Sequence, residues 1–177
     1  AGHANIEEEL RPALEGLAMP YGDVPVGGWR ITPYVVIQNV GAYLDVPRFL
    51  DVDHPIHKAA DAEAYLARLE SFAAQLDGES QRLKATGAMG VYAPAFLLDR
   101  AIAQMTQSIA GAREGGSLVH SIARRTQDIP GTWAAQARTL TQQQIAPALE
   151  RQLSELKAQR AHATMDPMNA TALYTGD

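Results

Sequence analysis

The clearest pattern in the chain is an amphipathic stripe between Asp61 and Thr86. Apolar residues follow one another there at intervals of three and four, with one turn skipped at Glu79. This is the period of an α-helix with one buried face. Acidic residues at its start and Gly87 and Gly90 after it are typical helix start and stop signals. We therefore predict a long helix here. The stripe consists of Tyr65, Leu69, Phe72, Leu76 and Leu83.

Two more helices with the same period follow. Pro94 begins the first, whose apolar stripe runs from Leu98 to Ala112, and the pair Gly115–Gly116 closes it. Ser117 is placed to cap the next helix, which continues through Ala123 and ends before Pro130.

The last helix is predicted to run from about Thr132 toward Ala163. Its apolar stripe slips by one residue at 141–144, and Pro147 follows directly. A kink or a break in the helix explains both facts.

The two ends of the chain have less regular sequence patterns than the middle. A capped amphipathic pattern predicts a helix over 5–18, and a segment rich in proline and glycine predicts a loop over 19–33, with Trp29 anchoring it. Past Thr164 the pattern fades into an irregular tail, 165–177.

The stretch from Thr32 to Pro55 departs most from a regular period. Its β-branched residues at 35–37 favour a strand locally, whereas its helical neighbours favour a short helix over 34–40, which we prefer. We expect a break near Gly41. Pro47, with Asp45 as its cap, is predicted to open one short helical turn over 48–50.

Together these elements predict an all-α fold, an antiparallel bundle of long helices with a loop-rich segment near 19–57. We expect one helical unit over 1–164, followed by the tail. Composition agrees, because 46% apolar and 20% charged residues among 177 are ordinary for a globular domain. The net charge of −5 gives no sign of nucleic-acid binding, and no apolar run is long enough to span a membrane.

Familiar catalytic motifs are missing from the sequence. It contains no cysteine, no His-Glu-x-x-His zinc helix, no Gly-x-Ser-x-Gly nucleophile elbow and no phosphate-binding glycine loop. The five potential ligands between Asp51 and Asp61 read as the acidic approach to a helix, with capping residues, rather than as a metal site. We assign no residue to catalysis or to metal binding.

Four polar side chains in the irregular stretch are the candidates for ligand contact. Amides and phenols beside apolar residues suit the wall of a peptide-binding cleft, where they bond to the backbone of an extended ligand. They equally suit the satisfaction of buried backbone groups in a nearby loop. The predicted substrate-binding residues are Tyr34, Gln38, Asn39 and Tyr43.

The same stretch resembles the bacterial family called domain of unknown function 885. The specific block is residues 32–51, which read TPYVVIQNVGAYLDVPRFLD, followed by His54-Pro55 and by DAEAYLARL over 61–69. Weaker blocks are PAFLLD at 94–99, SIARRT at 121–126 with IPG at 129–131, and PALERQ at 147–152. The resemblance covers roughly 14–164.

This resemblance implies a function that the residues alone do not. Members of the family are mostly helical and resemble zinc metallopeptidases, with a His-Glu-x-x-His helix in their C-terminal half, and many carry export signals. It therefore implies a noncatalytic, cleft-forming N-terminal part of a zinc-dependent peptidase-like hydrolase. Zinc and the catalytic residues are expected in a C-terminal part or a partner chain, and the expected substrate is a peptide. The expected location of the protein is the bacterial periplasm or outside the cell, with the cytoplasm as the alternative.

The alternative is a self-contained helical module that binds other proteins and catalyses nothing. The hypothesis of a cleft-forming part predicts an exposed apolar face where the catalytic part would dock, whereas the hypothesis of an interaction module predicts a polar surface all round.

Overall fold

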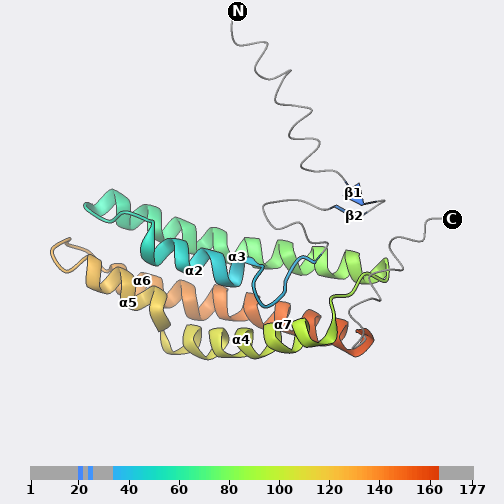
Figure 1. The fold of residues 1–177 in the computed structure, drawn as a ribbon. Helices are drawn as coiled ribbons and strands as arrows, with labels where there is room; N and C mark the ends of the chain where they lie inside the picture. Colours follow the sequence, from blue (N-terminus) through green and yellow to red (C-terminus); the bar gives the residue numbers. More distant parts are fainter. Residues whose placement is uncertain (1–19, 22–23, 26–33, 164–177) are drawn as a thin grey trace, which may run out of the picture.

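The computed structural model describes residues 20–21, 24–25 and 34–163, and it confirms an all-α architecture (Figure 1). The helices are α2 (Ala42–Val52), α3 (Ala59–Ala88), α4 (Ala95–Glu114), α5 (Gly116–Arg125), α6 (Trp133–Leu140), the π-helix η1 (Thr141–Ile145) and α7 (Ala146–His162). The predicted helix over 5–18, the Trp29 anchor and the tail over 165–177 lie outside the described residues. Within the predicted loop, β1 (Pro20–Tyr21) and β2 (Val24–Pro25) form a two-residue antiparallel pair.

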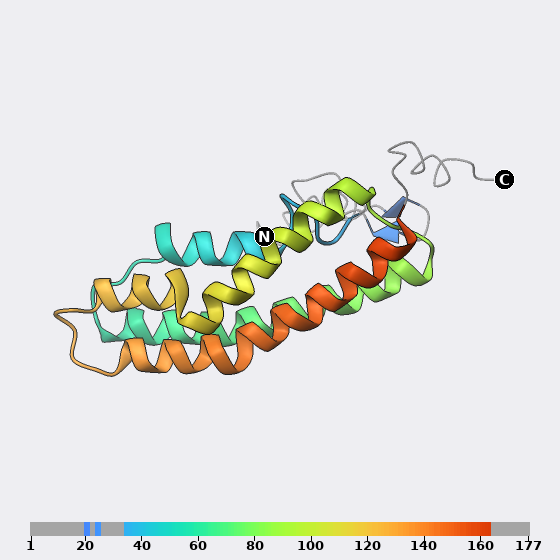
Figure 2. The ribbon, with the colours of Figure 1, turned by 90° about the horizontal axis from the view of Figure 1, so that it is seen from below.

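The long helices lie along one bundle axis in alternating directions. Figures 1 and 2 show α3 and the continuous α6–η1–α7 running one way, and α2, α4 and α5 running the other. Helix α7 packs against α3 and α4, while α2 packs against α3 and α5. The predicted antiparallel bundle of long helices is therefore confirmed.

One apolar core joins these helices, and it explains why the stripes predict them well. The predicted stripe of α3 is buried throughout, and that of α4 faces the same core with only Ile102 half-buried. The largest fully buried apolar side chains are Tyr65, Phe72, Leu50, Leu69, Leu76, Leu98, Met105, Ile122, Ile145 and Leu156. Burial of a side chain of this size contributes about 1.5–3 kcal/mol, so the stripe decides which face of each helix turns inward.

Helix ends follow the predicted signals in most places. Asp61 accepts hydrogen bonds from the backbone N–H groups of His57 at 2.9 Å and Lys58 at 3.1 Å, so it caps the start of α3. Pro94 is the N-cap of α4. Gly115, at φ 95°, adopts the left-handed conformation that ends α4 and allows α5 to start at once. Ser117 does not cap α5, because it lies inside that helix and no side chain bonds to its N-cap.

The irregular stretch differs from its prediction. Residues 34–40 form no helix; they make a tight turn in which Ile37 and Val40 exchange backbone hydrogen bonds of 3.0 and 3.2 Å. Helix α2 then begins at Ala42, so Pro47 lies inside a helix and does not open a new turn. Asp45 lies in the first turn of α2 and does not act as the expected cap.

The slip in the last stripe is accommodated without a break. The π-helix η1 inserts one extra residue, and the N–H of Ala146 bonds to the carbonyl of Thr141 five residues earlier. A π-turn keeps Thr141 and Ile145 both on the buried face. Pro147 contributes to this widening, because its ring would crowd the carbonyl of Gln143 in a regular α-helix.

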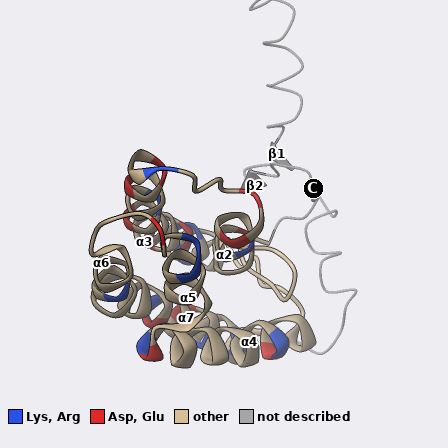
Figure 3. Ribbon diagram, turned by 90° about the vertical axis from the view of Figure 1, so that its left-hand side faces the viewer, with Lys and Arg blue, Asp and Glu red and all other residues tan. Residues whose placement is uncertain are grey.

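Acidic and basic residues are interspersed over α2, α3, α4 and α7, whereas α5 and α6 carry arginine and no acidic residue (Figure 3). Exposed ion pairs connect α7 to its neighbours, through Arg151 with Asp77 at 2.7 Å and Arg160 with Asp99 at 2.6 Å. Exposed pairs contribute little, about 0–1 kcal/mol each, so the core dominates stability. Over the ranges that the structure describes, no helix has the length and apolarity needed to cross a bilayer.

Candidate functional site

Helix α2 is held at both ends by charged side chains from other helices. The N–H of Ala42, in its first turn, donates to Glu79 Oε1 of α3 at 2.9 Å. At the other end, Arg125 of α5 donates through Nη1 to the carbonyl of Leu50 at 2.9 Å and through Nη2 to that of His54. An anion at the N-terminus and a cation at the C-terminus both complement the helix dipole. These two contacts fix where α2 lies.

Glu79 is a buried carboxyl group whose environment is unusual. Its side chain is 5% exposed, and Oε2 accepts a hydrogen bond from Gln152 Nε2 at 3.0 Å. Burial raises the pKa of Glu79, and the hydrogen bonds from Ala42 and Gln152 only partly oppose that shift. The same residue therefore supports α2 and retains its proton more tightly than an exposed glutamate.

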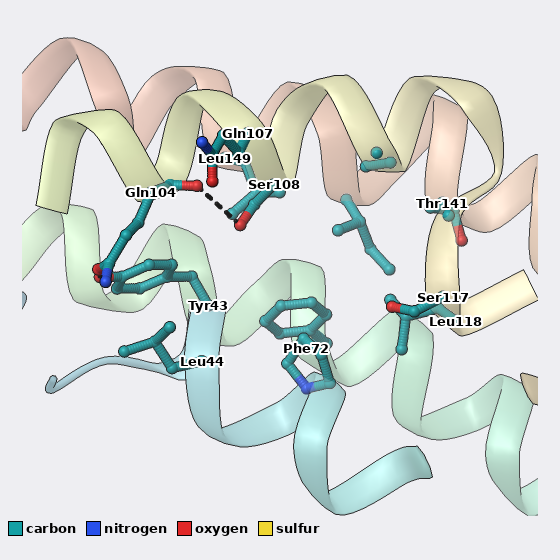
Figure 4. A pocket seen from close by; sticks show the side chains of 15 residues that line it. Tyr43, Leu44, Phe72, Gln104, Gln107, Ser108, Ser117, Leu118, Thr141 and Leu149 are labelled. Carbon is teal, nitrogen blue, oxygen red and sulfur yellow. Dashed lines mark hydrogen bonds between the residues drawn. The ribbon is translucent and has the colours of Figure 1, made fainter. Parts of the chain in front are cut away.

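A pocket of about 410 Å³ lies where α4 gives way to α5. Its fifteen lining residues come from six elements (Figure 4). They are Tyr43, Leu44, Pro47, Phe72, Gln104, Gln107, Ser108, Gly111, Ala112, Gly116, Ser117, Leu118, Thr141, Ile145 and Leu149. None of them carries a formal charge. The pocket therefore combines apolar side chains with neutral hydrogen-bonding groups.

Tyr43 places a phenol at this pocket from the first turn of α2. Its hydroxyl oxygen lies 3.0 Å from the carbonyl oxygen of Ile37 and 2.8 Å from Gln104 Oε1. Burial, and secondarily the Glu79 carboxylate, raise the pKa of Tyr43 to about 12. The phenol consequently stays protonated at neutral pH and serves as a hydrogen-bond donor, not as a base.

The polar rim of the pocket is formed mainly by α4 and α5. Gln104, Gln107 and Ser108 project from neighbouring turns of α4, and Ser117 lies opposite on α5 (Figure 4). Ser108 donates to its own helix, at the carbonyl of Gln104, 3.1 Å away. Among the described residues, the side chains of Gln107 and Ser117 have no hydrogen-bond partner. Their amide and hydroxyl groups are thus available to a ligand.

Small residues and the π-helix create the space. A Cβ built on Gly111 meets no atom within 4 Å, so the missing side chain leaves open volume. Thr141 and Ile145 of η1 form part of the opposite wall. Single π-turns occur frequently at functional sites, which agrees with a role for this pocket.

Of the four predicted ligand-contact residues, the structure brings only Tyr43 to the pocket. Gln38 accepts a hydrogen bond from Arg100 at 3.0 Å, Asn39 is exposed in the turn, and Tyr34 packs half-buried against the core. The predicted short helix over 34–40 does not form, so Tyr34 and Gln38 do not share a helical face. A ligand contact by any of the four stays a prediction.

Within the histidine and aspartate cluster, Asp61 has the capping role that the sequence indicates. His54 is buried and its Nε2 lies 3.0 Å from the carbonyl oxygen of Asp61, whose carboxylate caps α3. The backbone hydrogen bond from His57, more than any other contact, lowers the pKa of Asp61. Over the described part of the chain, no group of three or more His, Cys, Asp or Glu is placed to hold a metal ion.

Sequence reasoning missed Glu79, Gln104, Gln107, Ser117 and Arg125. A signal exists only for Glu79, which occupies a position where the stripe of α3 skips an apolar residue. A carboxylate on a buried helix face requires a hydrogen-bond partner, so its place in the stripe indicates a buried polar contact at Glu79. The other four lie on exposed or half-buried helix faces. Ser117 gives only the signal of a helix cap, and the remaining three look like ordinary surface residues.

Comparison with known proteins agrees with the specific block over 32–51. A family model described as "Bacterial protein of unknown function (DUF885)" matches residues 3–176. No curated protein and no solved structure gives a significant match. Because the family match extends over nearly all of the sequence, the chain belongs to the bacterial family DUF885.

Proposed function

We propose that these helices form a noncatalytic wall of the peptide-binding cleft in a zinc-dependent, peptidase-like hydrolase. The His-Glu-x-x-His zinc site would belong to a C-terminal part of the same protein or to a partner chain, in an exported bacterial protein. Membership of the family supports the proposal; the class of enzyme itself is inferred from the resemblance of family members to helical zinc peptidases.

The pocket at the junction of α4 and α5 carries the proposal. Peptide groups offer both N–H and C=O, and side-chain amides such as Gln107 bond to both. The apolar floor, which includes Phe72 and Leu149, suits one side chain of the same peptide. Pockets that bind small ligands and peptides combine apolar walls with a few polar groups in this way.

Exposed apolar side chains support contact with a further part of the protein. Phe49 and Val52 lie one turn apart at the end of α2, with 41% and 70% of their surface exposed. Hydrophobic groups that neighbour each other on a surface are typical of an interaction site.

Filling the pocket tests the proposal. In the whole protein, Gly111→Leu places a side chain in the open volume, and Gly78→Leu is the matched control because Gly78 also has no atom within 4 Å and lies away from this pocket. We expect a fluorogenic peptide to be hydrolysed with about 10- to 100-fold higher KM in Gly111→Leu, with kcat little changed, because a buried side chain is worth about 1.5–3 kcal/mol.

Metal analysis completes the experiment. We expect zinc in the purified protein and equal zinc content in both variants. If the whole protein neither contains zinc nor cleaves peptides, the enzyme assignment is wrong and the interaction module becomes the better description. If Gly111→Leu and Gly78→Leu behave alike, the pocket does not bind substrate.

A further inference from the structure

We propose that the pocket accepts uncharged peptide side chains, both apolar and amide-bearing, and rejects charged ones. This inference rests on the proposed function, since it names the selectivity of the same site. It starts from the composition of the lining. All fifteen residues are neutral, although one residue in five of the chain is charged.

Depth separates the polar from the apolar contacts. Phe72, Leu118 and Leu149 are buried and form the floor, whereas Gln104, Gln107 and Ser117 are exposed at the rim. Figure 4 shows the ring of Phe72 below the glutamines of α4. A side chain that enters the pocket therefore leaves water for a mainly apolar surface. The buried hydroxyls of Tyr43 and Thr141 are already hydrogen-bonded within the protein, so uncommitted amide and hydroxyl partners lie near the mouth.

A charged group in this position would have no counter-ion. Removing a charge from water without a partner is far more costly than removing an apolar group or a satisfied amide. Two cations lie near the wall and both already have partners: Arg113 pairs with Glu150, and Arg138, beside Gly115, donates to the carbonyl of Glu114.

The first turn of α5, with Gly116 and Ser117, adds partial positive charge at the wall, and the last turn of α4, with Gly111 and Ala112, adds partial negative charge, so neither sign of ligand charge is favoured. Lysine and aspartate should accordingly both be poor occupants.

Gln104 and Gln107 differ in how freely they can adapt. Gln104 is held by the hydroxyl of Tyr43, at 2.8 Å, whereas the described structure gives the side chain of Gln107 no hydrogen bond. An amide can turn over to offer either its oxygen or its NH₂ group. Gln107 can therefore pair with either the oxygen or the NH₂ group of an amide side chain, whereas an apolar side chain would be held by the apolar floor. It is also the position where an added charge should change selectivity.

The test uses the whole protein and four fluorescent peptides that differ only in one central residue, Leu, Gln, Asp or Lys. Fluorescence anisotropy gives the Kd of each. We expect the Leu and Gln peptides to bind at least about tenfold more tightly than both the Lys peptide and the Asp peptide. Gly111→Leu should weaken binding of the Leu and Gln peptides, and Gly78→Leu should not.

Charge substitutions at the rim then reverse the preference. Gln107→Glu should improve binding of the Lys peptide by about two- to fivefold, and Gln107→Lys should improve that of the Asp peptide by a similar factor, as expected for a partly exposed ion pair. The same substitutions at Gln75, which is exposed on α3 outside the pocket, are the controls. A purely structural role of Gln107 would not produce opposite effects on the two peptides.

The outcomes separate the two proposals. If no peptide binds, or if Gly111→Leu changes nothing, the proposed function fails and this inference fails with it. If binding is sensitive to Gly111→Leu but the Lys or Asp peptide binds as tightly as the Leu peptide, only the selectivity is wrong. The same conclusion holds if the substitutions at Gln107 act like those at Gln75.

Discussion

Replacing Glu79 by glutamine should change how the free energy of unfolding depends on pH. Burial raises the pKa of this carboxyl group above the ordinary value of 4.5 in the folded protein. A raised folded-state pKa means that the folded state binds the proton more tightly than the unfolded chain does. The stabilisation from this proton is fully present below pH 4.5 and is lost as the pH rises through the folded-state pKa.

The titration of one buried proton limits how steeply the stability can change with pH. Between the two pKa values the wild type loses at most about 1.4 kcal/mol per pH unit from this one group. Glutamine keeps the volume and an oxygen for the N–H of Ala42, but it carries no titrating proton. Its NH₂ group faces Gln152 Nε2, so the Gln152 amide must turn over and give up its bond to the carbonyl of Leu76. This cost is the same at every pH, so it shifts the difference in stability between variant and wild type by a constant and does not alter how that difference changes with pH.

Urea unfolding followed by far-UV circular dichroism from pH 4 to 8 measures both proteins. The stability of Glu79→Gln minus that of the wild type should rise with pH above about 4.5 and then level off. Glu70→Gln is the matched control, because Glu70 is exposed on the same helix. A difference that is flat, or falls with pH, or equals that of the control would refute the reasoning. Glu79→Ala adds a check: it leaves the buried N–H of Ala42 without an acceptor, at a cost of about 1–3 kcal/mol.

Two further predictions concern the junction of the helices. Gly111→Ala should stabilise the protein by about 0.5–1 kcal/mol, because alanine is the better helix former and the space is open. Gly116→Ala should destabilise it, because its Cβ would lie 2.7 Å from the carbonyl oxygen of Gly111. Thermal unfolding measures both effects. Arg125→Ala should lower the free energy of unfolding, measured in urea, by about 1–3 kcal/mol, because it removes the hydrogen bonds to the end of α2. Arg124→Ala is the control, since Arg124 pairs with Asp51 at 3.7 Å on the surface. Equal losses for the two variants would contradict this prediction.

The sequence predicts well whatever depends on neighbours along the chain. The stripe from Tyr65 to Leu83 marks α3, and Pro94 and Gly115 mark the ends of α4, because helical period and backbone restriction are local properties. The one-residue slip before Pro147 correctly indicates an irregularity. It does not distinguish a break from a π-turn, since the choice depends on whether the core holds both sides of the stripe in place.

The sequence alone thus determined the class of fold, the long helices and, through the block over 32–51, the family. Tertiary structure decided where α2 lies and what the chain offers to a ligand. The capping partners of α2 are 37 positions away for Glu79 with Ala42 and 75 for Arg125 with Leu50, so no local pattern contains them. The pocket likewise exists only because six separate elements converge. Hydrogen bonds and cavities are formed through space, whereas a sequence pattern records only neighbours along the chain.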